Sequence, residues 1–236
     1  MEAEIIMLEE LREKVCRANI MLQSLGLVQM TWGNASGISR EKNLIVIKPS
    51  GVAYDALTPD KMVVVDMRGH KVEGNLSPSS DTPSHVHLYN SFPEIGGVVH
   101  THSTWATVWC QAGRSIPPYG TTHADFAFGF IPCTRALTKA QTKSDYELNT
   151  GRAITRFFEE NSINYLDIPA VLVNSHGPFT WGANALVAVL NAKMLEETAM
   201  MAYHTEMLGR KEPIEPFLLE KHFTRKHGKD SYYGQL

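Results

Sequence analysis

The stretch Gly97-Val98-Val99-His100-Thr101-His102 carries the strongest structural signal in the chain. Its β-branched run predicts a strand, and Ser103 is placed to cap a helix that follows. Successive side chains of a strand point to opposite faces, so His100 and His102 project from the same face, about 6.6 Å apart along the chain. Both imidazoles can therefore reach one metal ion.

A second His-x-His pair, His85 and His87, receives a different interpretation. The segment Ser80-Asp81-Thr82-Pro83 places capping residues before a proline suited to a first helical turn, which predicts a helix over residues 83–91. Helical residues two apart are rotated by about 200°, so these imidazoles point away from each other. We interpret them as surface or packing histidines.

A third imidazole follows another predicted strand, over residues 170–173. His176 lies in the subsequent turn, which can direct its side chain back to the sheet edge. Three imidazoles and one carboxylate, Asp81, would leave a divalent metal with positions open to substrate oxygens, as a catalytic site requires. Zinc is the first choice, with manganese or cobalt as alternatives. On spacing alone, a structural role explains His100 and His102 equally well.

The remaining pattern predicts a single mixed α/β domain over residues 1–236, without repeats or low-complexity linkers. Apolar residues at steps of three and four predict helices, and short β-branched runs predict strands in an antiparallel part of a sheet. The predicted helices cover residues 5–25, 146–160 and 185–208, the strands cover 44–47 and 62–65, and residues 113–136 are rich in loops.

Composition excludes several classes of protein. The net charge is −3, and basic residues cluster only at Lys221, Arg225, Lys226 and Lys229, so no nucleic-acid footprint is present. Three widely spaced cysteines indicate neither a disulfide framework nor a metal knuckle. The acidic N-terminus and the lack of a long apolar run predict a cytoplasmic protein with no membrane segment.

Five segments together resemble the class II aldolase and ribulose-phosphate epimerase family. They are Thr31-Trp32-Gly33-Asn34-Ala35-Ser36, Lys48-Pro49-Ser50-Gly51, Pro78-Ser79-Ser80-Asp81-Thr82-Pro83, His100-Thr101-His102-Ser103 and Ser175-His176-Gly177-Pro178. The likeness continues to Lys226-His227-Gly228 and Tyr232-Tyr233-Gly234-Gln235, and it is greatest to the bacterial epimerases of the family. It implies a three-layer α/β/α sandwich around a mostly antiparallel central sheet, and a homotetramer with sites between subunits.

The resemblance also implies roles for particular residues. Asp81, His100, His102 and His176 would be the metal ligands. Gly33, Asn34, Ser50, Gly51, Ser79 and Ser80 would surround a substrate phosphate, with Lys48 adding positive charge. Hydroxyl, amide and backbone N–H groups are suitable phosphate donors, although without the resemblance these residues read as ordinary turn and cap residues.

Asp125 and Tyr233 resemble the acid/base pair of the family, with His222 a further candidate. The implied activity interconverts L-ribulose 5-phosphate and D-xylulose 5-phosphate by breaking and remaking the C3–C4 bond. The metal would hold the C2 and C3 oxygens and stabilise an enediolate. No GxGxxG fingerprint follows a strand, so a route through a nicotinamide cofactor lacks a binding site.

Two other functions compete with this one. A class II aldolase for fuculose or rhamnulose 1-phosphate would share the metal, but the family pattern there has Glu where this chain has Asp81. A non-catalytic scaffold of the adducin type would share the fold, and retention of all three histidines argues against it. Arabinose use and ascorbate breakdown require the same epimerisation, so the sequence does not separate these pathways.

Overall fold

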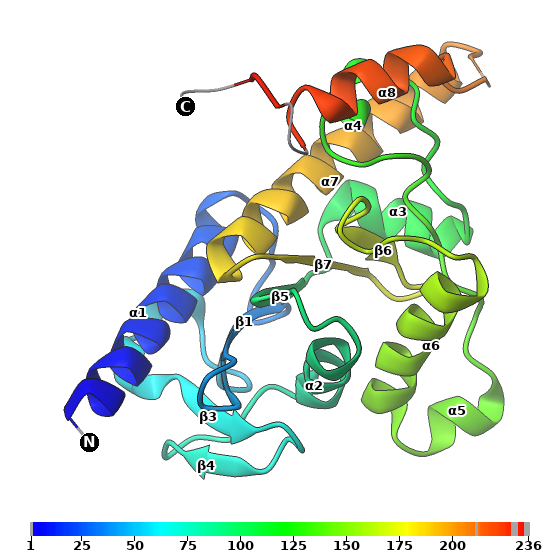
Figure 1. The fold of residues 1–236 in the computed structure, drawn as a ribbon. Helices are drawn as coiled ribbons and strands as arrows, with labels where there is room; N and C mark the ends of the chain where they lie inside the picture. Colours follow the sequence, from blue (N-terminus) through cyan, green and yellow to red (C-terminus); the bar gives the residue numbers. More distant parts are fainter. Residues whose placement is uncertain (1, 211, 228–230, 234–236) are drawn as a thin grey trace.

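The computed structural model describes residues 2–210, 212–227 and 231–233, in which helices pack around a central group of strands (Figure 1). The strands are β1 (Asn34–Ser39), β2 (Leu44–Ile47), β3 (Val63–Asp66), β4 (Lys71–Glu73), β5 (Gly97–His100), β6 (Ala170–Leu172) and β7 (Pro178–Gly182). The α-helices are α1 (Glu2–Ser24), α2 (Thr82–Ser91), α3 (Thr104–Ala112), α4 (Thr121–Ala124), α5 (Lys139–Lys143), α6 (Tyr146–Glu160), α7 (Ala185–Met207) and α8 (Pro216–Thr224). Short 3₁₀ turns η1 (Tyr54–Ala56) and η2 (Pro59–Lys61) precede β3.

Within the described ranges, all seven strands belong to one sheet in the order β4-β3-β2-β1-β5-β7-β6. Every neighbouring pair of these strands is antiparallel. The prediction of an antiparallel sheet is therefore confirmed. The predicted strand at residues 62–65 is displaced by one residue and begins at Val63.

Helices cover both faces of the sheet, and the alternation of side chains along the strands explains why. Ile45 and Val65 contribute to a core that includes residues of α2, α3 and α6, whereas Val46 and Val64 contribute to a core with α1 and the first half of α7. Each fully buried aliphatic side chain contributes about 1.5–3 kcal/mol. Figure 1 shows α1 and α7 on one side of the strands and α2 and α6 on the other. The predicted three-layer α/β/α arrangement is thus confirmed.

The predicted helices match well. α2 and α6 coincide with residues 83–91 and 146–160 to within one residue, and α1 ends just before Gly26, whose φ of +69° suits a left-handed helix end. The loop-rich segment contains the short helix α4. Assignment of residues 1–236 to one domain stays a prediction.

Other sequence expectations concern the cysteines, the membrane and the tail. Cys16, Cys110 and Cys133 are free and buried. None of the helices in the described part of the chain is both long and apolar enough to cross a bilayer. In the tail, Tyr232 and Tyr233 both donate backbone N–H bonds to the Arg225 carbonyl, so this segment is held against the end of α8. Predictions that involve Gly228, Lys229 and residues 234–236 lie outside the described residues.

Candidate active site

Three strands bring the candidate residues to one edge of the sheet. His100, the last residue of β5, is paired with Asn34 at the start of β1 and with Phe179 near the start of β7. The loops that precede β1 and β7 and the loop that follows β5 therefore meet at this edge. His102 and His176 lie in two of these loops.

The imidazoles of His100, His102 and His176 converge on one point. The Nε2 atoms of His100 and His102 are 3.2 Å apart, and the potential ligand atoms of all three residues lie within 4.8 Å of one another. Two nitrogens of one tetrahedral zinc site are about 3.3 Å apart, given Zn–N bonds near 2.05 Å. The donor set therefore fits a divalent metal ion.

The structural reason why these imidazoles lie close together differs from the predicted one. β5 ends at His100 and α3 begins at Thr104, so His102 lies in the loop between them and not on a strand. The alternation of a pleated strand thus places His100 but does not account for His102. The proximity of the two imidazoles was predicted correctly, for a reason that holds for only one of them.

Hydrogen bonds and burial prepare these imidazoles for metal binding. His100 donates from Nδ1 to the Pro178 carbonyl at 3.0 Å, which leaves Nε2 free to face the other rings. Burial, reinforced by the neighbouring His100, lowers the pKa of His102, and the same two causes lower the pKa of His176 to about 3. Neutral imidazole is the form that binds a metal, so both residues are in that form at neutral pH.

The Asp81 carboxylate is half-buried and lines the same cavity as the three imidazoles, but it is not part of their convergent group. Asp81 precedes α2 without capping it through its side chain, contrary to prediction, and its Oδ2 instead accepts a 2.6 Å hydrogen bond from Asn34 Nδ2. Burial raises the pKa of this carboxyl, but the nearby imidazoles of His100 and His85 and the Asn34 bond outweigh burial and lower it. An anionic Asp81 can complement a cation here, and its role as a ligand stays a prediction.

The histidines open into a cavity of about 590 Å³. All ten residues predicted as metal ligands or phosphate contacts line this cavity, together with Lys48. The complete lining is Thr31, Trp32, Gly33, Asn34, Lys48, Pro49, Ser50, Gly51, Ser79, Ser80, Asp81, His100, His102, Tyr146, Glu147 and His176. Residues that are far apart in the sequence thus form one wall, as the resemblance implied.

Backbone hydrogen bonds hold together the two loops that contain the predicted phosphate contacts Ser50 and Ser79. Ser79 donates its N–H to the Lys48 carbonyl at 3.0 Å, and Ser50 donates to Ser77 at the same distance. Gly33 has a φ of +88°, and a Cβ at this position would lie 2.9 Å from the His100 carbonyl oxygen. Glycine is therefore required at this position by both backbone conformation and space.

Lys48 supplies positive charge at the cavity wall. The residue is buried, and its ammonium donates to the Val52 carbonyl at 2.7 Å and lies 4.8 Å from the centre of the Tyr54 ring. Burial lowers the pKa of Lys48 to about 8. At neutral pH the group remains mostly charged, and an anion in the cavity would favour the charged form further.

Several residues near the site were missed or only partly interpreted. Tyr146 and Glu147 begin α6 and line the cavity, and the Tyr146 hydroxyl lies 3.3 Å from His176 Nδ1. The sequence predicted this helix but contained no signal that placed its start here. His85 is a packing histidine, because it is fully buried with Nδ1 2.7 Å from Ser36 Oγ. His87 contacts Thr155 through Nε2 at 2.9 Å.

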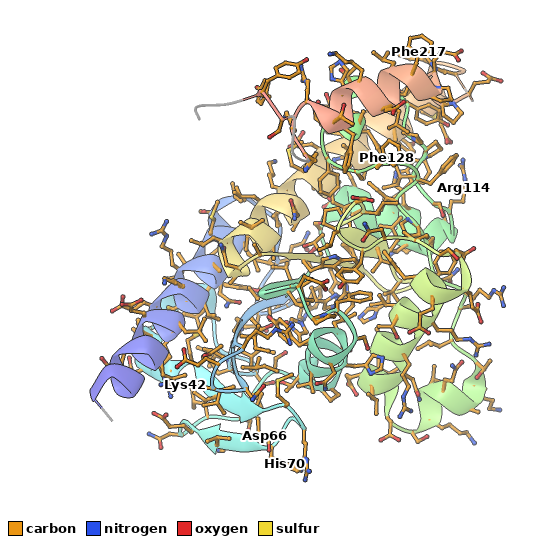
Figure 2. All side chains as sticks on the ribbon, in the orientation of Figure 1. Lys42, Asp66, His70, Arg114, Phe128 and Phe217 are labelled. Atoms are coloured by element: carbon orange, nitrogen blue, oxygen red, sulfur yellow. The ribbon has the colours of Figure 1, made fainter. Side chains whose placement is uncertain are left out.

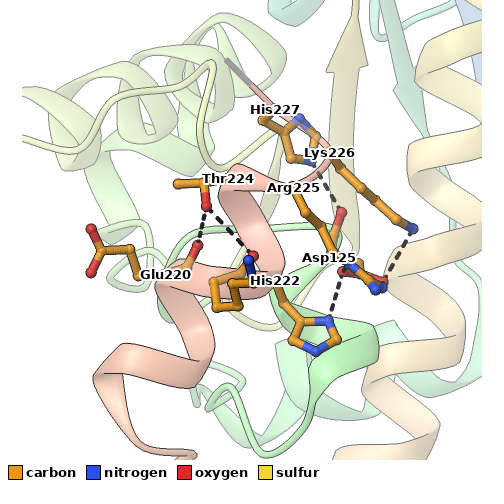
Figure 3. A network of polar contacts seen from close by, with 8 residues as sticks. Asp125, Glu220, His222, Thr224, Arg225, Lys226 and His227 are labelled. Atoms are coloured by element: carbon orange, nitrogen blue, oxygen red, sulfur yellow. Dashed lines mark hydrogen bonds and ion pairs between the residues drawn. The ribbon is translucent and has the colours of Figure 1, made fainter. Parts of the chain in front are cut away.

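The predicted acid/base residues form a separate cluster at the α8 end of the molecule. Asp125 follows α4, and its carboxylate accepts hydrogen bonds from Arg225 Nη2 at 2.6 Å and His222 Nδ1 at 3.0 Å, while Lys226 Nζ lies 3.2 Å away (Figure 3). The Tyr233 ring lies 4.9 Å from the Arg225 guanidinium and 4.5 Å from the Lys226 ammonium. The same two cations therefore contact both predicted acid/base residues.

This cluster does not contribute to the histidine cavity of its own chain. Ring contact between Phe128 and Phe223, with centroids 5.1 Å apart, packs α8 against the loop that follows α4. Figure 2 shows Phe128 beneath α8, at the opposite end of the molecule from Asp66 and His70 of the β3–β4 hairpin. The structure therefore brings Asp125 and Tyr233 together but separates them from His100, His102 and His176.

The ion pairs of Asp125 predict a pH-dependent contribution to stability. Partial burial raises the pKa of this carboxyl, but hydrogen bonds from Arg225, His222 and Lys226 outweigh burial and lower it to about 2. This value is below the unfolded value of about 3.9, so the stabilisation is present above pH ~4 and is lost as the pH falls through about 2.

We therefore expect Asp125→Asn to lower the free energy of unfolding by about 1–2 kcal/mol at pH 7, after allowance for solvent screening. Urea unfolding of both proteins between pH 7 and pH 2 measures the difference. The gap should be constant down to pH ~5 and should shrink below pH ~4. A gap that widens as the pH falls would contradict the ion-pair interpretation.

Fold and cavity together describe an α/β protein with a candidate metal site at the edge of an antiparallel sheet. A family model, described as class II aldolase and adducin N-terminal domain, matches residues 13–203. The chain therefore belongs to the class II aldolase and adducin family, as the resemblance of its motifs predicted.

Individual relatives agree with this assignment. L-ribulose-5-phosphate 4-epimerase UlaF of Salmonella paratyphi B (strain ATCC BAA-1250 / SPB7) is 52% identical over 229 residues, which cover 97% of this chain and 100% of the relative. The protein of the same name from Salmonella paratyphi A (strain ATCC 9150 / SARB42) matches with the same identity and coverage. A solved structure named L-fuculose 1-phosphate aldolase superposes with a TM-score of 0.77 at 23% identity, and covers 92% of this chain and 95% of its own. That structure establishes the fold.

Proposed function

We propose that the protein is an isomerase that interconverts L-ribulose 5-phosphate and D-xylulose 5-phosphate, that is, an L-ribulose-5-phosphate 4-epimerase. The observation that carries the proposal is the 52% identity, over 97% of the chain, to relatives of that name. The cavity supports it, because the residues predicted for metal and phosphate binding line one space of about 590 Å³. This volume suits a small sugar phosphate.

His100, His102 and His176, with Asp81 as a fourth ligand, would hold a divalent cation, for which zinc is the first choice and manganese or cobalt are alternatives. When bound, this cation would act as a Lewis acid toward an oxygen-rich substrate. The metal-dependent chemistry of the family and the convergence of three neutral imidazoles support the assignment. Retention of this donor set also argues against a non-catalytic scaffold.

Other residues of the cavity lining would bind the phosphate. Hydroxyls of Ser50, Ser79 and Ser80 and backbone N–H groups at Gly33 and Gly51 can donate to phosphate oxygens. Lys48 adds positive charge there. Asn34 donates to Asp81 and to Ser79, so it connects the phosphate side of the cavity to the metal side.

The chemistry of the substrate selects bond cleavage over simple deprotonation. C4 is β to the C2 ketone, so its hydrogen is not acidified, whereas cleavage of C3–C4 leaves negative charge on a carbon conjugated with the carbonyl. Rotation of the released aldehyde before recombination inverts C4. Asp125 and Tyr233 would move protons at the C4 oxygen, one on each face.

These two residues can act on substrate only if they reach a histidine cavity. Within one chain they do not line it, so we propose that they complete the cavity of a neighbouring copy in a homotetramer. Exposed apolar residues at the same end of the molecule, among them Phe217 and Leu208, provide surface for such contacts. The active site would then lie between subunits.

The first experiment assays the purified protein with L-ribulose 5-phosphate and, in parallel, with L-fuculose 1-phosphate. We expect conversion of the first to D-xylulose 5-phosphate without added NAD and no net cleavage of the second. Net release of an aldehyde and a ketone phosphate from L-fuculose 1-phosphate would favour the aldolase instead.

The same reaction in D₂O tests the route. We expect no deuterium at C4 of the product by NMR, because the C4 hydrogen stays attached as the aldehyde hydrogen. Deuterium at C4 would reject the cleavage route while leaving the epimerase assignment in place.

A further inference from the structure

The start of α3 lies two residues after His102 and needs acceptors for its first N–H groups. Ser103 occupies the N-cap position, as predicted, but its side chain accepts no capping hydrogen bond. The Ser103 hydroxyl instead accepts a long bond, 3.4 Å, from Thr101 Oγ1. The prediction that Ser103 caps this helix through its side chain is therefore wrong.

A glutamate from a distant helix supplies the missing acceptors. Glu196 of α7 accepts the Trp105 N–H on Oε1 at 2.9 Å and the Ala106 N–H on Oε2 at 3.0 Å. Only 9% of Glu196 is exposed. A carboxylate at a helix N-terminus is favoured by the helix dipole, and hydrogen bonds to an ionised acceptor are stronger than neutral ones.

The two ends of the loop that carries His102 are therefore anchored in different ways. His100 is fixed by pairing within the sheet, and the start of α3 is fixed to α7 by Glu196. A second bond one turn along α7, from Trp109 Nε1 to the Ala199 carbonyl at 3.0 Å, reinforces the α3–α7 contact. Between these anchors, the course of the loop determines where the His102 imidazole lies.

We propose that Glu196 is a positioning residue for the metal site, which holds His102 at ligand distance from His100 and His176 by fixing the start of α3. The proposal rests on the proposed metal site. Outer groups that orient metal ligands commonly change metal affinity by about 10–100-fold when removed. Glu196 would act in this way through the backbone of the ligand loop and not by contact with an imidazole.

The test compares Glu196→Ala and Glu196→Gln with a matched control. Glutamine keeps the shape and one acceptor oxygen, whereas alanine removes both. Glu197 is the neighbouring residue on α7, and its carboxylate pairs with Lys193 on the same helix, so Glu197→Gln removes a charge without contact to α3. The dissociation constant for zinc is measured by competition with a chelator, and the visible spectrum of the cobalt-substituted protein reports ligand geometry.

We expect the zinc dissociation constant to rise about 10–100-fold in Glu196→Ala and less in Glu196→Gln, with an altered cobalt spectrum in both, and no change in Glu197→Gln. A purely structural cap would destabilise the metal-free and zinc-loaded proteins equally and leave the dissociation constant unchanged. An unchanged zinc dissociation constant in Glu196→Gln overturns the positioning role. This variant decides the test if the alanine variant does not fold. Failure of the wild-type protein to bind zinc overturns the metal site and this proposal together.

Discussion

His102→Ala is expected to remove metal binding and epimerase activity together. The variant leaves two imidazoles where three converge, and its remaining donors cannot enclose a cation as the wild-type set does. Loss of the Lewis acid removes several kcal/mol of transition-state stabilisation, which corresponds to a fall in kcat/KM of roughly 1,000-fold or more. Elemental analysis of purified protein and the epimerase assay measure the two effects.

His70 provides the matched control for this experiment. It is an exposed histidine of the β3–β4 hairpin (Figure 2), it is paired with Asp66 at 3.2 Å, and it does not line the cavity. His70→Ala should therefore keep both metal and activity. Thermal unfolding adds a second readout, since a ligand that binds only the folded state raises its stability with concentration. Zinc should raise the melting temperature of His70→Ala and leave that of His102→Ala nearly unchanged, and full metal occupancy in His102→Ala would remove this residue from the ligand set.

Tyr233→Phe should suppress turnover and leave both folding and metal content intact. The substitution removes only the phenol O–H and keeps the ring that contacts Arg225 and Lys226. Loss of a positioned proton donor commonly costs about 100- to 10,000-fold in rate. Tyr232→Phe is the control, because Tyr232 is as exposed as its neighbour but contacts Lys221. Equal rates for wild type and Tyr233→Phe would exclude the residue from the mechanism.

The position of the acid/base cluster relative to the cavity predicts the outcome of mixing two inactive variants. Asp125→Asn should lose activity with its cavity intact, and His102→Ala should lose it with its α8 cluster intact. If each site takes residues from two subunits, random exchange restores both native halves in about a quarter of the sites. Mixtures should therefore regain about a quarter of wild-type activity. Absence of rescue, despite exchange shown by mass spectrometry, would indicate a site contained within one chain.

Local pattern was sufficient to predict most secondary structure. Residues 146–160 have helical spacing that depends on neighbours three and four positions away, and α6 has these bounds. The β-branched run before His100 depends on alternate neighbours, and β5 contains it. The prediction failed at Ser103, which was expected to cap α3 through its side chain because it directly precedes the helix. The carboxylate that caps α3 comes from Glu196, 91 positions after the residue it binds.

The candidate site also contains residues that the sequence predicted and residues that it did not. The resemblance of short motifs to a known family identified His100, His102 and His176 and the loops that line their cavity. No sequence motif indicated that Tyr146 would lie beside His176, because a tyrosine at the start of a helix has no required partner. No motif indicated that Arg225 and Lys226 would form ion pairs with Asp125 and contact the Tyr233 ring away from that cavity.

The sequence by itself determined the mixed α/β class, the long helices α1, α2, α6 and α7, the strands β2, β3, β5 and β6, and the chemical types available at the cavity. These properties follow from periodicity and residue chemistry, which are local. The tertiary structure decided that β1, β5 and β7 present their ligand loops at one sheet edge, that Glu196 anchors one of these loops, and that Asp125 lies apart from the histidines. Packing of the two helical layers on the sheet sets these relations, because contacts between residues some 90 positions apart depend on how whole elements fit together.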